Sequence, residues 1–194
     1  MANRNVGILR RRFLRSVLIS GVGMVFCGRV SAADSENDIK SGLQILINAL
    51  RSTHNTACLR ESKRIDVAFA SNQAINLHLR NADLNVNEAE IIAKALHESS
   101  LYGDPGLNSF SMSYNPGLTD AGVAALAKAL PRSLTEVGFA GCAIGDEGGA
   151  ALVEFCRHAH GLRMICAESN RFSRKIKNRF ALLSQERADL LVIV

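Results

Sequence analysis

The chain has 194 residues, enough for one domain with a sizeable apolar core. Its composition, 47% hydrophobic and 21% charged, is that of an ordinary globular protein. The formal charge of +5 comes from the N-terminus: six of the 23 basic side chains lie in residues 1–32 with no acid, which leaves 17 basic against 18 acidic residues. A nucleic-acid-binding domain keeps its basic surface in the folded part, so we expect no nucleic-acid partner.

Residues 1–32 have the three-part layout of a cleavable secretory signal peptide. A basic cluster, Arg10 to Arg15, precedes a short apolar run, Val17 to Phe26, and small residues then favour cleavage after Ala32. The apolar run is too short to span a bilayer. We therefore expect no stable membrane span after cleavage.

The basic cluster, "RRRFLR", resembles the bacterial twin-arginine export signal. Arg10 and Arg11 match its paired arginines, Phe13 and Leu14 match its apolar pair, and Arg15 stands where a lysine is usual. The resemblance implies export of an already folded protein, to the periplasm or out of the cell.

Two other kinds of targeting signal remain open for this segment. An arginine-rich start without acids also suits a mitochondrial presequence. Cys27 suggests a lipoprotein, although Phe26 precedes it where a small residue is expected. All three interpretations predict that the fold begins near Ala33.

Residues 33–73 are expected to form an N-terminal capping helix and strand. The stretch Asp34 to Ser52 predicts an amphipathic helix, with one apolar stripe formed by Ile39, Leu43, Leu46 and Leu50. Alternating apolar residues from Arg64 to Ala70 predict a strand beside the part that follows.

Residues 74–194 repeat one skeleton of about 28 residues four times. Each copy has an inward apolar pair with one residue between: Leu77/Leu79, Phe110/Met112, Val137/Phe139 and Ile165/Ala167. Three residues later each copy has a turn position, occupied by Ala82, Asn115, Cys142 and Asn170. This spacing matches the leucine-rich repeat pattern L-x-x-L-x-L-x-x-N/C-x-L, in which the asparagine amide hydrogen-bonds unpaired backbone groups.

The second half of each copy predicts a helix. "LTDAGVAALAKAL", echoed by "IGDEGGAALVEFC", resembles the ribonuclease-inhibitor-like class of leucine-rich repeats, with a small pair (Gly122-Val123, Gly148-Gly149) opening the helix. Thr119 or Asp120 is expected to cap the first of these helices. The fold class that follows is an α/β leucine-rich-repeat solenoid, with short parallel strands on the concave face and α-helices on the convex face. The final "ADLLVIV" predicts a strand that closes the sheet.

No catalytic set, metal site or cofactor motif stands out. His158 and His160 lie beside Cys156 at a spacing that does not suit helical metal ligands, and no second cluster completes a set. We expect free thiols at Cys58, Cys142, Cys156 and Cys166, with a disulfide from Cys58 left open. The basic run from Arg171 to Arg179 is interpreted as a solvated helix face, or else as a surface for an acidic partner or a membrane.

The concave strand positions are the candidate site, because solenoids bind through regular, rigidly spaced residues there. The candidates are Asn76, His78, Arg80, Ser109, Ser111, Ser113, Tyr114 and Glu136, followed by Gly138, Ala140, Met164, Cys166 and Glu168. The resemblance implies a binding scaffold, so we expect a monomeric, exported, non-enzymatic protein-binding module without cofactors. The alternative is a structural or host-directed effector protein of the cell envelope, and an enzyme is less favoured.

Overall fold

The computed structural model describes residues 32–194, so the predicted signal peptide, apart from Ala32, lies outside the described residues. Two helices come first, α1 (Ala32–Ser52) and α2 (Thr56–Ala70). Four strand-helix units follow: β1 (Ile75–His78) with α3 (Val86–Ser100), β2 (Leu107–Ser111) with α4 (Thr119–Ala129), β3 (Glu136–Gly138) with α5 (Asp146–His158), and β4 (Met164–Cys166) with α6 (Arg174–Glu186). A short 3₁₀ turn, η1 (Pro116–Leu118), precedes α4, and β5 (Leu191–Ile193) comes last.

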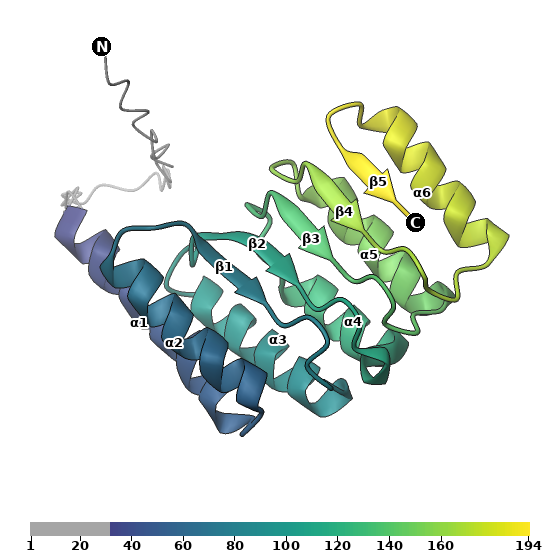
Figure 1. Cartoon of the computed structure of the whole chain (residues 1–194). Coiled ribbons are helices and arrows are strands. Elements are labelled where there is room, and N and C mark those ends of the chain that lie inside the picture. Colours follow the sequence, from purple (N-terminus) through teal and green to yellow (C-terminus); the bar gives the residue numbers. More distant parts are fainter. Residues whose placement is uncertain (1–31) are drawn as a thin grey trace, which may run out of the picture. The chain divides into compact units, whose positions relative to one another are not determined.

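The strands form one five-stranded parallel sheet in the order β1-β2-β3-β4-β5 (Figure 1). Neighbouring strands in the sheet are neighbours in the sequence, with helices on the return path, which is the topology of a solenoid. This confirms the predicted α/β leucine-rich-repeat architecture with four strand-helix units. The predicted last strand is also confirmed, since β5 pairs in parallel with β4.

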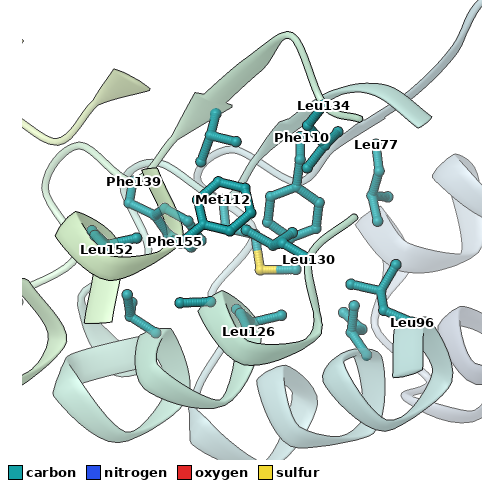
Figure 2. Close-up of a cluster of buried hydrophobic side chains, with 14 of the residues drawn as sticks. Leu77, Leu96, Phe110, Met112, Leu126, Leu130, Leu134, Phe139, Leu152 and Phe155 are labelled. Carbon is teal, nitrogen blue, oxygen red and sulfur yellow. The ribbon is translucent and has the colours of Figure 1, made fainter. Parts of the chain in front are cut away.

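The core lies between the sheet and the helices. All four predicted inward pairs are buried, and Figure 2 shows Phe110 of β2 and Phe139, just after β3, facing helix side chains such as Leu126 and Leu152. The rings of Phe110 and Phe139, from adjacent units, have centroids 5.8 Å apart. One unit cannot bury its apolar face alone, so stacking makes the core continuous along the solenoid.

The expected strand at residues 64–70 is wrong, because this segment belongs to helix α2. Asn55 caps the helix, with its side-chain oxygen accepting hydrogen bonds from the backbone N–H groups of Ala57 and Cys58. The buried side of the helix has helical spacing and consists of Cys58, Glu61, Ser62 and Ile65. Two of those four residues are polar, so the sequence shows no apolar stripe at helical spacing here. Val67, which was part of the alternating pattern read as a strand, is 64% exposed.

Helix α2 covers the outer edge of β1. The carboxylate of Glu61, 2% exposed, lies 3.5 Å from the backbone nitrogen of His78 and accepts its N–H, which has no strand partner on that side. Arg64 contacts the same carboxylate at 3.1 Å. The N-terminal edge of the sheet is therefore closed by a helix and a buried carboxylate, a way of protecting edge strands from association.

Asn115 joins the first and second units. Its side chain is fully buried, and its oxygen accepts the N–H groups of Ala82 and Leu84 at 2.8 and 3.1 Å. Its amide nitrogen donates to the carbonyl oxygens of Leu79 and Met112, both at 2.7 Å. One side chain thus satisfies backbone groups of two successive turns, as the repeat pattern predicted.

Asn170 repeats this arrangement between the third and fourth units, whereas Cys142, between the second and third units, does not. The oxygen of Asn170 accepts the N–H groups of Cys142 and Ile144, and its nitrogen donates to Phe139 and Ala167. Cys142 donates its thiol to the carbonyl oxygen of Met112 at 3.2 Å. Burial raises the pKa of this thiol, which keeps it protonated and able to donate.

The expected cap at Thr119 or Asp120 is wrong, since α4 begins without a side-chain cap. Asp120 instead accepts the N–H groups of Gly145 and Gly148 at 2.8 and 2.7 Å, and so caps helix α5 of the next unit. Asp146 likewise accepts the N–H and hydroxyl of Ser173 at the start of α6. These bonds hold the pKa of Asp146 below its usual value.

We expect Asn115→Ala to lower the free energy of unfolding by about 3 kcal/mol, because it leaves buried N–H and carbonyl groups without partners. Asn170 is partly exposed, so water can replace its amide, and Asn170→Ala should cost roughly 1 kcal/mol. Urea denaturation followed by circular dichroism measures both. Exposed Asn178 on α6 is the control, and equal losses for Asn115 and Asn170 would contradict the burial argument.

Candidate protein-binding face

The helix-free face of the sheet, here called the concave face, presents its side chains in three rows across the strands. Strand register aligns Asn76, Ser109, Glu136 and Met164 in a first row, and His78, Ser111, Gly138 and Cys166 in a middle row. Backbone hydrogen bonds just beyond the strands extend the alignment to a carboxyl row of Arg80, Ser113, Ala140 and Glu168. The predicted candidates therefore gather on one surface.

Tyr114 and Arg80 form the most prominent feature of this face. The guanidinium carbon of Arg80 lies 5.3 Å from the centroid of the Tyr114 ring, within the range of a cation–π contact. Tyr114 itself has a left-handed backbone with φ +63°, and its ring packs so close to Gly141 that a Cβ there would fall 3.0 Å from a ring carbon. The stack therefore holds two large side chains in place at the β1 and β2 end.

The middle of the face is a floor of small residues. A Cβ on Gly138 would lie 2.8 Å from the Ser111 hydroxyl oxygen and 3.1 Å from that of Ser113, so a larger residue there would displace the Ser111 side chain. The hollow above this floor has a volume of about 160 Å³ and is lined from β1 through β4. Such a shallow, open hollow suits part of a protein surface better than an enclosed small molecule.

Two candidate serines lie on this face but are largely covered. Ser109 is 5% exposed and Ser113 is 3% exposed, because groups of neighbouring units bond to them. The Ser113 hydroxyl accepts the N–H of Ala140 at 3.1 Å. These serines shape the floor, whereas a partner would touch the exposed side chains around them.

His78 and Ser109 come together in a way the sequence did not predict. The His78 Nε2 and Ser109 Oγ atoms are 2.7 Å apart, and Ser109 donates its own proton to the side-chain oxygen of Asn76 at 2.8 Å. With this proton donated to Asn76, Ser109 accepts from the His78 tautomer that carries its ring proton on Nε2. A serine nucleophile needs the opposite arrangement, with the histidine accepting the hydroxyl proton.

The charges of the concave face are not neutralised within the described residues. The ion pairs among the described residues, such as Arg51 with Asp66 and Arg163 with Asp189, do not involve Arg80, Glu136 or Glu168. All three of these side chains are exposed. Charges of this kind are available to a partner.

Strand β5 extends the face beyond the predicted candidates. Leu191 aligns with Met164 of the first row, and Ile193 aligns with Cys166 of the middle row. Leu191 is 57% exposed, so the face becomes apolar at this end. The 27-residue step from Glu136 back to Ser109, applied forward from Met164, would have identified both residues from the sequence.

A second hollow lies on the helical side, between the ends of α4 and α5. It encloses about 330 Å³ and includes Lys128, Leu130, Arg132, Glu154 and His158 among its lining residues. Glu154 already contacts Arg157 and His158 in this region. The hollow is larger than the one on the concave face, but its acid is paired with neighbours.

The remaining candidates for chemistry are placed as follows. The part of the chain that the structure describes has no group of three or more histidine, cysteine or acidic side chains able to hold a metal ion. Cys58, Cys142, Cys156 and Cys166 are free thiols, so the open disulfide from Cys58 is absent there. Between Ala32 and Val194 no helix combines the length and apolarity needed to cross a membrane.

Comparison with known protein families agrees with this geometry. A family model described as "Leucine Rich repeat" matches residues 105–127 and 131–153, which contain β2 with most of α4 and β3 with most of α5. Both segments are leucine-rich repeats. Repeats of this family typically serve as binding scaffolds, and no catalytic family is indicated. No curated protein matches the chain.

Cys166 should be the most reactive thiol of the described residues. It is half-buried on the concave face, whereas burial raises the pKa of Cys58 and Cys142, and that of Cys156 to about 12. In a Cys27→Ser variant, a maleimide at neutral pH should label Cys166 at least about tenfold faster than the other three, because reaction needs an accessible thiolate. Peptide mapping by mass spectrometry measures the four rates, and equally fast labelling of Cys156 would contradict the expectation.

Proposed function

We propose that this chain is an exported, non-enzymatic protein-binding module that holds its partner on the concave face. The observation that carries the proposal is the Arg80–Tyr114 stack beside a floor of small residues, with unpaired charges around it. Arginine and tyrosine are the residue types that dominate binding energy at protein interfaces, provided that they are held rigidly. Both are held here, by each other and by the contact of Tyr114 with Gly141.

Three further features support a binding scaffold over an enzyme. The concave hollow is open and shallow, and its one histidine-serine pair has the wrong direction of hydrogen bonding for nucleophilic attack. The two matched segments are repeats of a family that typically binds proteins.

Full helices in the second half of each unit, together with close packing at Gly122 and Gly148, support assignment to the ribonuclease-inhibitor-like class.

Capture from an envelope extract tests the binding site. Tyr114→Ala and Arg80→Ala should each reduce recovery of the same partner about tenfold, the effect expected of interface anchors. Tyr102→Ala is a matched control, since Tyr102 is 46% exposed in the loop after α3 and Tyr114 is 44% exposed. Arg60→Ala, on exposed surface of α2, is the control for Arg80.

Equal recovery of the partner by all four variants would contradict the proposal. A loss confined to Tyr102→Ala or Arg60→Ala would also contradict it, because the partner would then bind elsewhere. Circular dichroism of each variant checks that the fold is intact.

The export part of the proposal rests on the resemblance of residues 10–15 to the twin-arginine signal. We expect Arg10→Lys with Arg11→Lys to abolish export and leave an uncleaved chain in the cytoplasm of a bacterial host. In wild type, mass spectrometry should find a mature N-terminus at Ala33. Cleavage that continues in a host without twin-arginine transport would overturn this export route and would not affect the binding proposal.

A further inference from the structure

The carboxyl row of the concave face has opposite charges at its two ends. Arg80 stands on the β1 side and Glu168 on the β4 side, and both are exposed. Between them lie Ser113 and Ala140, which are 3% and 2% exposed and form a low floor. The row is therefore a short trough that is positive at one end and negative at the other.

The two end charges are too far apart to neutralise each other. Adjacent strands lie about 4.8 Å apart, so the three strand spacings from β1 to β4 separate the two backbone positions by about 14 Å. The Debye length at physiological ionic strength is about 8 Å, which screens exposed charges at that separation. Each end is consequently free to pair with a group on a partner.

Each end also has a defined chemical preference. The Arg80 guanidinium is stacked on Tyr114, which orders its planar donors for a carboxylate, the group that arginine binds through two parallel hydrogen bonds. At the other end Glu168, with Glu136 in the first row of the neighbouring strand, favours an ammonium or guanidinium group. Between the two ends, the hollow of about 160 Å³ above Ser113, Ala140 and Gly138 leaves room for a partner side chain.

From this arrangement we infer that the concave face recognises a protein segment that runs across the strands and carries an acidic and a basic side chain about 14 Å apart, with the side chains between them lying in the hollow. The acidic group pairs with Arg80 and the basic group with Glu168. An extended segment covers this span in about four residues, and a helix in about nine. The inference rests on the proposed function and adds the chemistry of the partner.

Selection from a random 12-residue peptide library displayed on phage tests the inference with the full-length chain as target. Peptides selected on wild type should share an acid and a base separated by about four or nine residues. Arg80→Glu and Glu168→Arg should each weaken a selected peptide about tenfold, because attraction becomes repulsion. The double variant should bind the version of that peptide whose two charged residues are exchanged.

Arg60→Glu with Glu90→Arg is the matched control, since both residues are exposed on helices away from the concave face, and it should leave peptide binding unchanged. Selected peptides that depend on Tyr114 but lack a charge pair would overturn the inference and keep the proposed function. Peptides insensitive to Tyr114→Ala and to both charge reversals, or no enrichment at all, would overturn the inference together with binding at this face.

Discussion

Hydrogen bonds from side chains of one unit to the backbone of a neighbouring unit hold this molecule together. Asn115 and Asn170 fill the spaces under the turns, and their amides satisfy backbone groups that no strand or helix reaches. Asp120 and Asp146 do the same on the other side, each capping the start of the next unit's helix. The concave face depends on these bonds, because its three rows stay aligned only while successive turns have the same shape.

Spacing in the sequence predicted the repeated part of the fold, because strand alternation and turn positions are local patterns that stacking does not change. The α2 helix was missed for a physical reason. Its buried side contains the polar residues Glu61 and Ser62. Burial of Glu61 is explained only by the adjacent edge of β1, where its carboxylate accepts the N–H of His78. The cap made by Asp120 was misassigned for a similar reason, since its acceptor role joins residues 25 and 28 positions away.

The candidate site was predicted as a surface but not as a set of contacts. Alternation alone places His78, Ser109 and Ser113 on the concave face. Their burial and bonding depend on which residues of the next strand stand beside them, and this needs the register between strands. The stack of Arg80 on Tyr114 likewise requires the left-handed backbone of Tyr114, which strand alternation does not reveal.

Cys142 has a consequence for how this solenoid comes apart. A thiol is a weak donor and a poor acceptor, so the turn between the second and third units lacks the four-bond bridge that Asn115 and Asn170 provide at the other two junctions. In stacked repeats, stability is close to a sum of unit and junction energies, and local opening begins where the junction energy is smallest. Packing offsets this loss at the Cys142 junction, because α4 and α5 pack together more extensively than α5 and α6, and the Phe110 and Phe139 rings meet across it.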